Sequence, residues 1–245
     1  MLFFRSLLFS LGMITSTLLF APLSMLTFPF PLPQRYAFIS QWARFNLWWL
    51  AVTCKLNYRV EGAENIPDHP CVILCKHQSA WETLALQMIF PQQVWVIKRE
   101  LLWVPFFGWG LAMLKPIAIN RQAARQALRQ LVEQGSQRLA DGLWVVIFPE
   151  GTRVAPGEKL PYAPGGALLA HRTGHAVVPV AHNAGEFWPR RGFLKRPGTI
   201  RLVIGTPILT GTPHTKDINT SEINALAEHW IENTMTRISG TAAKQ

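Results

Sequence analysis

A histidine and a glutamate stand five positions apart in the segment Lys76–Glu82, directly after the apolar run Cys71–Cys75. Imidazole titrates close to neutral pH, and a carboxylate bound to one ring nitrogen fixes the tautomer and leaves the other nitrogen free as a general base. On a regular helix, two side chains at this spacing point about 140° apart. His77 and Glu82 can therefore meet only if a turn precedes the helix, and Ser79, a good N-cap residue, predicts that turn.

The same spacing has a second, purely structural interpretation. Ser79 and Glu82 have the pattern of a capping box, in which the glutamate side chain accepts a hydrogen bond from the amide of the N-cap residue. The segment alone leaves both interpretations open, a catalytic pair and a helix cap.

A second candidate segment is Phe148–Arg153, which follows another apolar run. A turn containing glycine at the end of a strand directs Glu150 and Arg153 out of the sheet, and a guanidinium held there can bind phosphate through two hydrogen bonds. Sheets of α/β proteins commonly bind their ligands at the carboxyl ends of the strands. Both segments therefore stand where such a sheet places a site.

Short apolar runs alternate with amphipathic stretches and must position these residues. The runs typical of strands are Cys71–Cys75, Val94–Ile97, Ile117–Ile119, Leu143–Phe148, Val177–Val180 and Ile200–Ile204. The stretches typical of helices are Ser79–Phe90, Gln122–Leu139, Gly166–Thr173 and Ser221–Ile238. This alternation predicts an α/β domain, with a mixed central sheet flanked by helices.

An uncharged apolar segment extends from Ser6 to Phe28 and is long enough to cross a hydrocarbon core as a helix. The alternative is a cleaved secretory signal with Arg5 as its basic end, but no small-residue cleavage site follows the apolar run. Positive charge is heavier after the segment than before it. This bias predicts attachment to the inner membrane with the body of the protein on the cytoplasmic side.

A second apolar helix is predicted from Tyr36 to Cys54, and it carries several tryptophans together with basic residues. Aromatic rings beside cations are typical of a helix that lies at a membrane surface. The alternative is that these tryptophans pack on the catalytic domain. We therefore expect membrane-anchoring helices in residues 1–57 and an α/β catalytic domain in residues 58–245.

Composition limits the partners. The formal net charge is +10, which favours anionic partners. No Lys/Arg-rich run, zinc-finger spacing or RNA-binding aromatic pattern occurs, so we expect a lipid surface and no nucleic acid. The three cysteines have no metal-binding spacing, so no metal site is expected, and Cys71 and Cys75 are predicted to be core residues of one strand face. A catalytic thiol remains the alternative for them.

Four blocks in this order resemble those of the glycerolipid acyltransferase family: His77 with its acidic partner Glu82, Asn120-Arg121, Phe148–Arg153 and Val177–Val180. The resemblance extends from about residue 71 to residue 181, and weakly on to residues 205–208. It implies transfer of a fatty acyl group from acyl-CoA or acyl carrier protein to the sn-2 hydroxyl of 1-acyl-glycerol-3-phosphate. The product would be phosphatidic acid for phospholipid biosynthesis, made without a cofactor.

The resemblance also implies roles for individual residues. His77 deprotonates the acceptor hydroxyl without forming an acyl-enzyme, and Glu82 orients the imidazole. The substrate-binding residues that it implies are Lys98, Arg121, Glu150, Gly151, Thr152 and Arg153, with the basic members holding the acceptor phosphate. For Lys98 the alternative is a solvated strand end.

Departures from the family pattern leave the acceptor open. The second block usually reads G-x-x-F-I-D-R, whereas residues 115–121 read K-P-I-A-I-N-R. Another glycerolipid or lysophospholipid acceptor is therefore an alternative. A lipid-binding protein without activity is a further alternative, but lipid binding requires neither His77 nor Glu82. Serine hydrolysis is disfavoured because no G-x-S-x-G motif occurs.

Overall fold

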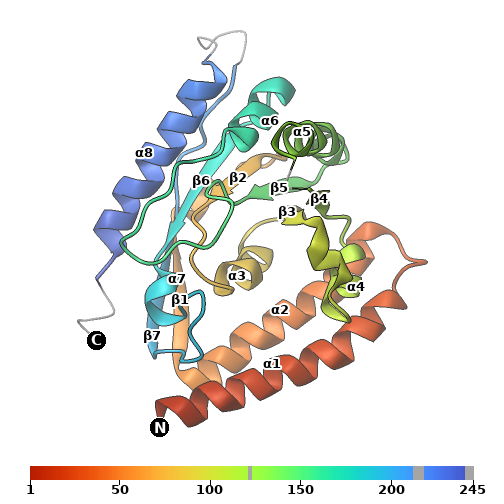
Figure 1. The fold of residues 1–245 in the computed structure, drawn as a ribbon, viewed down its shortest axis with the longest axis vertical. Helices are drawn as coiled ribbons and strands as arrows, with labels where there is room; N and C mark the ends of the chain where they lie inside the picture. The colour runs from red at the N-terminus through yellow and green to blue at the C-terminus, as the bar shows by residue number, and fades with distance from the viewer. Residues whose placement is uncertain (121–122, 212–217, 241–245) are drawn as a thin grey trace.

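The computed structural model describes residues 1–120, 123–211 and 218–240. Its centre is a seven-stranded sheet with the strand order β1-β7-β6-β2-β5-β3-β4 (Figure 1). All neighbouring strands are parallel except β6 and β7, which are antiparallel. The strands are β1 (Leu56–Glu61), β2 (Val72–Cys75), β3 (Gln93–Lys98), β4 (Ile117–Ile119), β5 (Trp144–Ile147), β6 (Val177–His182) and β7 (Gly198–Ile204). The expected α/β class with a mixed sheet is confirmed.

Helices cover both faces of the sheet, as Figure 1 shows. Helices on one side are α1 (Leu2–Met25), α2 (Leu32–Cys54), α3 (Trp81–Ile89) and α4 (Phe107–Ala112), and those on the other are α5 (Ala124–Ala140), α6 (Gly165–Thr173) and α8 (Thr220–Ile238). The alternation of side chains along β2 explains this layering. Ile73 and Cys75 belong to the core beneath α2 and α3, whereas Val72 and Leu74 belong to the core beneath α5, α6 and α8.

The position of β2 in the sheet determines where a site can form. It lies between β5 and β6, and β3 lies beyond β5. These four strands are parallel, so their carboxyl ends meet at one edge of the sheet. The chain segments that leave this edge begin at Lys76, Phe148, Asn183 and Arg99. Both segments singled out from the sequence are among them.

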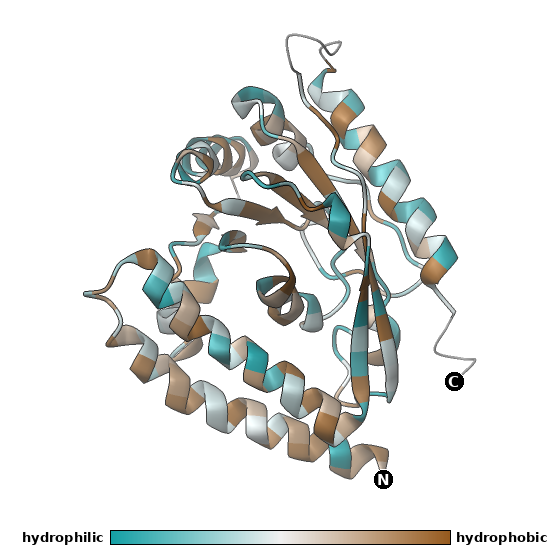
Figure 2. Cartoon of the chain, turned by 180° about the vertical axis from the view of Figure 1, so that it is seen from behind, coloured by the Kyte–Doolittle hydropathy of each residue, from teal (hydrophilic) through white to brown (hydrophobic). Residues whose placement is uncertain are grey.

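The N-terminal helices form an antiparallel pair. α1 ends at Met25, and prolines at 29, 31 and 33 separate it from the body of α2, which has Pro33 in its first turn. Proline is tolerated there because the first amides of a helix have no partner within it. α1 is the one described helix long and apolar enough to span a membrane. Figure 2 shows that its residues are largely apolar, and leucines at positions 8, 11, 18 and 19 are exposed along it.

The second helix occupies a layer between α1 and the α/β domain. Ala43, Leu50 and Cys54 of α2 are buried in the same core as Ile73 of the sheet. The helical pair therefore shares the core of the α/β domain, and the boundary expected between residues 57 and 58 falls within β1. Trp42 and Trp49 are half-buried, and their indole nitrogens donate to Ser16 and Leu8 of α1, whereas Trp48 is exposed. Packing therefore accounts for two of these tryptophans, and the surface role of the helix stays a prediction.

Candidate active site

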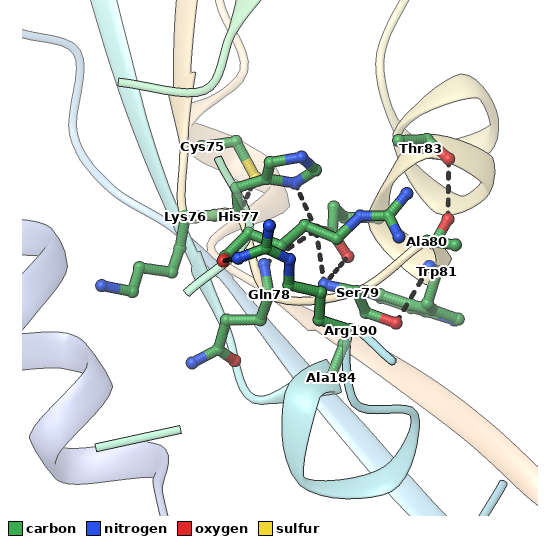
Figure 3. A network of polar contacts seen from close by, with 12 residues as sticks. Cys75, Lys76, His77, Gln78, Ser79, Ala80, Trp81, Thr83, Ala184 and Arg190 are labelled. Carbon is green, nitrogen blue, oxygen red and sulfur yellow. Dashed lines mark hydrogen bonds and ion pairs between the residues drawn. The ribbon is translucent and has the colours of Figure 1, made fainter. Parts of the chain in front are cut away.

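His77 follows β2 in a turn that ends where α3 begins, at Trp81. Because the turn is not helical, the two predicted partners face each other: Nδ1 of His77 and Oε1 of Glu82 are 2.8 Å apart. Figure 3 shows the imidazole above the turn from Gln78 to Ala80. The predicted geometry of the pair is therefore present.

The Glu82 carboxylate also caps the turn. Its oxygens accept hydrogen bonds from the amides of Gln78 (2.9 Å) and Ser79 (2.8 Å). The predicted bond from the Ser79 amide to Glu82 is thus present, but the N-cap residue of α3 is Ala80 and not Ser79, so the capping box is incomplete. The catalytic role of the same carboxylate stays a prediction. Burial alone raises the pKa of Glu82, but the hydrogen bonds from His77 and from the Ser79 amide oppose it, and the pKa is lowered overall. Glu82 is an anion at neutral pH.

The imidazole of His77 is also held by an aromatic ring. It stacks on Phe148, with ring centroids 3.9 Å apart and planes 14° from parallel. The imidazole is thus fixed in orientation by a hydrogen bond in its plane and a ring on its face. Because Nδ1 donates to Glu82, Nε2 carries the lone pair, and that nitrogen is the one able to accept a proton.

The Pro-Glu-Gly turn is bonded to the backbone of His77 on both sides. The His77 amide donates to Oε2 of Glu150 (2.9 Å), and its carbonyl accepts from the Val154 amide (2.7 Å). Gly151 has a φ of +67°, a backbone conformation that favours glycine. The turn that contains Arg153 is therefore hydrogen-bonded directly to the backbone of His77.

A buried ion network lies behind the turn. The Lys76 ammonium is 2.7 Å from Oε1 of Glu150 and 2.7 Å from Oε1 of Glu232 on α8, and Tyr162 donates to the same Glu232 oxygen. Burial alone lowers the pKa of Lys76, but the two carboxylates outweigh it and raise the pKa overall. Burial raises the pKa of Glu150 to about 7, although the Lys76 ammonium opposes this. Lys76 and Glu232 are 156 positions apart, and no local motif indicates the pairing.

A second histidine, His182 at the end of β6, supports the same turn. It is fully buried; Nε2 donates to the Lys76 carbonyl (2.8 Å), and Nδ1 accepts from the Ala184 amide. Burial lowers the pKa of His182, while Glu82, 3.8 Å away, opposes this. His182 is therefore neutral and holds the backbone next to His77.

A cavity of about 610 Å³ opens beside the histidine, within the usual size range of ligand sites. Its apolar lining comes from α1, α2, α3, β3 and α4, including Phe20, Leu84 and Leu111. Its polar lining includes His77. The charged residues in the described lining are all basic: Lys98, Arg153 and Arg190. The cavity thus combines a long apolar wall with a cationic region near the base.

Only some of the predicted substrate-binding residues line the cavity. Lys98, Gly151, Thr152 and Arg153 all line the cavity. Glu150 does not line it, because its carboxylate is taken up by Lys76 and the His77 amide. Arg121 lies outside the described residues. Arg190, which the sequence did not indicate, lines the cavity from the loop after α7 (Ala184–Phe187).

Metal ligands and cysteine thiols are two other kinds of reactive group in the described part of the chain. No group of three or more His, Cys, Asp or Glu residues there could hold a metal ion. Cys71 and Cys75 are fully buried, and burial raises the pKa of both thiols. A buried thiol with a raised pKa is a poor nucleophile. The histidine pair and its cavity are therefore the candidate active site.

A model of the acyltransferase family matches residues 57–183, which include His77, Glu82 and the turn that carries Arg153, but not the cavity wall formed by α1 and α2, nor Arg190. The chain belongs to the acyltransferase family. It is 47% identical to a 1-acyl-sn-glycerol-3-phosphate acyltransferase of Pseudomonas aeruginosa, over 96% of this chain and 91% of the relative. A human relative, 1-acyl-sn-glycerol-3-phosphate acyltransferase beta, is 29% identical over 71% of this chain and 62% of its own length.

The fold is also similar to a solved structure. The crystal structure of the 1-acyl-sn-glycerophosphate acyltransferase from Thermotoga maritima superposes with a TM-score of 0.76, covering 97% of this chain and 95% of that one. The two sequences are 21% identical, so this likeness supports the fold. It covers the N-terminal helical pair as well as the α/β domain.

Proposed function

We propose that this protein transfers a fatty acyl group to the sn-2 hydroxyl of 1-acyl-glycerol-3-phosphate and so forms phosphatidic acid for phospholipid biosynthesis. The observation that carries the proposal is the oriented His77–Glu82 pair beside an apolar cavity whose charged lining is entirely basic. An apolar wall suits acyl chains, and the cations suit a phosphate. The names of the relatives agree with this acceptor.

The reaction follows from the position of the base. Nε2 of His77 takes the proton of the acceptor hydroxyl as its oxygen attacks the carbonyl carbon of an acyl thioester. The C–O bond forms, the tetrahedral intermediate collapses, and the C–S bond breaks. His77 then returns the proton to the leaving thiolate, which departs as a thiol. Glu82 stabilises the imidazolium between the two proton transfers.

The donor is an acyl thioester of either coenzyme A or acyl carrier protein, and the reaction needs no cofactor because the thioester supplies the chemical driving force. A basic surface suits the phosphates of one donor and the acidic surface of the other. The acceptor enters from a membrane, with which the exposed apolar face of α1 associates. We place the catalytic domain on the cytoplasmic side of the inner membrane, because positive charge is heavier after α1 than before it.

The proposal is tested by comparing acceptors. The kcat/KM of purified wild type, Arg153→Ala and Arg153→Lys is measured with 1-acyl-glycerol-3-phosphate and with the uncharged monoacylglycerol. Loss of a charge-assisted hydrogen bond lowers kcat/KM about ten- to a hundredfold. We expect this loss for the phosphorylated acceptor in Arg153→Ala, with partial recovery in Arg153→Lys because an ammonium lacks the planar fork.

The control acceptor decides between phosphate binding and a general role of Arg153. Monoacylglycerol, which has no phosphate, is expected to react at a rate that neither variant changes. An equal loss with both acceptors would show that Arg153 serves the fold or the donor. Failure of the wild type to acylate 1-acyl-glycerol-3-phosphate, with turnover of another lysophospholipid, would overturn the proposed acceptor.

A further inference from the structure

We propose that Arg190 is a second guanidinium ligand of the acceptor phosphate and completes, with Arg153, a clamp around that group. This inference rests on the proposed function and deepens it, because it assigns specificity to a residue beyond the segment matched by the family. Arg190 belongs to the loop between α7 and β7, on the opposite side of β2 from the turn that carries Arg153.

The two arginines are in direct contact. Nη1 of Arg190 donates a hydrogen bond of 2.8 Å to the backbone carbonyl of Arg153. Both residues line the cavity that His77 lines, and Figure 3 shows Arg190 beside the turn that carries the imidazole. One N–H of Arg190 is used in this contact, which leaves the other guanidinium donors for a ligand.

The cationic lining forms no close ion pair within the described chain, and Glu100 acts on Lys98 only at longer range. No carboxylate lies within ion-pair distance of Lys98, Arg153 or Arg190 there. The two carboxylates nearest the base, Glu82 and Glu150, are buried and bonded to backbone amides, His77 and Lys76. Cations without a close ion pair around one cavity favour an anion, and a phosphate monoester approaches two negative charges at neutral pH.

The loop that carries Arg190 is fixed by contacts within the loop and by contacts of α7, the helix that precedes it. On one side, Lys195 is buried against the rings of Phe9, Trp188 and Phe193, and its amide donates to the Ser6 hydroxyl of α1. On the other side, the Gly185 amide donates to Oε1 of Gln78 in the active-site turn, at 3.3 Å. Arg190 is therefore placed by the N-terminal helix and by the active site together.

The chemistry of the acceptor accounts for two arginines near the base. In 1-acyl-glycerol-3-phosphate only two carbons and one ester oxygen separate the reacting hydroxyl oxygen from phosphorus. A phosphate bound in the cationic part of the cavity therefore brings the hydroxyl towards Nε2 of His77. Planar guanidinium groups bind phosphate oxygens through paired hydrogen bonds, so two of them fix its orientation as well as its position.

The test uses the neighbouring arginine as a control. Arg191 is in the same loop, is exposed, and does not line the cavity. We expect Arg190→Ala to lower kcat/KM for 1-acyl-glycerol-3-phosphate about ten- to a hundredfold, and Arg191→Ala to change it by less than about twofold, the usual scale of a surface substitution. Arg190→Gln retains a hydrogen-bond donor without the charge, so it should also lose activity, whereas Arg190→Lys should recover part of it.

Two further measurements distinguish binding of the acceptor phosphate from binding of the acyl donor. The inhibition constant of the 2-deoxy analogue of the acceptor, which keeps the phosphate but cannot be acylated, should rise in Arg190→Ala, and the KM for the acyl donor should stay unchanged. A raised donor KM with an unchanged analogue constant would assign Arg190 to the donor and overturn the inference. Activity of Arg190→Gln equal to that of the wild type would overturn it as well.

Failure of this inference is distinguishable from failure of the proposed function. If the wild type acylates 1-acyl-glycerol-3-phosphate, and Arg190→Ala matches Arg191→Ala, the clamp is wrong while the function stands. If the wild type does not acylate this acceptor, the function fails first. Thermal unfolding of each variant shows whether the loop has kept its packing, because loss of the Arg153 contact alone should leave the melting temperature nearly unchanged.

Discussion

Replacing Glu82 with glutamine removes one charge from the site and almost no volume. In the structure Oε1 accepts from His77, Gln78 and Ser79, and a glutamine carbonyl can accept the same three hydrogen bonds. The amide nitrogen would then face the Ser79 amide, which is 3.1 Å from Oε2. The main effect is the loss of the anion that stabilises the His77 imidazolium.

The size of the effect follows from the distance. Unit charges 2.8 Å apart interact by about 6 kcal/mol at an effective dielectric constant of 20. The amide keeps a hydrogen bond, and the backbone amides around Glu82 already offset part of its charge, so we expect about half of this, about 3 kcal/mol. Since about 1.4 kcal/mol changes a rate tenfold, kcat should fall about a hundredfold.

The assay is steady-state turnover of purified Glu82→Gln with saturating donor and acceptor. We expect the loss in kcat with little change in either KM, because Glu82 is fully buried and does not line the cavity. The matched control is Glu64→Gln, the same chemical change on an exposed residue outside the site. A kcat within about threefold of the wild type, with the protein folded, would refute the catalytic pair and leave Glu82 as a helix cap alone.

Two other predictions concern stability and the cavity. As the pH falls from about 7 to 5, the wild type should lose more stability than His182→Asn, by up to about 1.4 kcal/mol per pH unit. The reason is that His182 binds a proton in the unfolded state, where its ordinary pKa is 6.5, but resists protonation in the folded state. Urea unfolding across this pH range measures the difference in unfolding free energy between the two proteins, from which the shared titration of Glu150 cancels. Parallel curves of unfolding free energy against pH would contradict this role of His182. Deleting residues 1–25 should abolish acyl transfer, because Met13 and Phe20 of α1 line the cavity. The control Leu18→Ser, on the exposed side of α1, should retain turnover. An active truncated protein would show that α1 is dispensable.

Local patterns were sufficient to predict most of the fold. The six apolar runs predicted as strands are all strands, and β2 and β5, in the middle of the sheet, are buried at every position, which produces a continuous apolar sequence. β1 (Leu56–Glu61) was missed because it is an edge strand in which apolar residues alternate with polar ones and form no continuous apolar run. α4 was missed because glycines at 108 and 110 and exposed aromatic residues hide its helical pattern.

The site, like the fold, was only partly predictable from local sequence. His77 and Glu82 could be paired from sequence because one short turn contains both. Glu150 was expected to contact substrate, but it instead turns inward, and nothing in the local sequence indicates that Lys76 is buried beside it. The partners of this ion network come from strands and a helix far apart along the chain, so only the folded sheet brings them together.

The ion network also bears on the order in which the site is completed during synthesis. His77 and the turn at Glu150 leave the ribosome early, but the Lys76 ammonium meets Glu232 only when α8, which follows every strand in the chain, has been made. Until α8 docks, Lys76 has one carboxylate partner instead of two. We therefore expect the backbone around His77 to reach its final stability only after the last helix of the chain has docked.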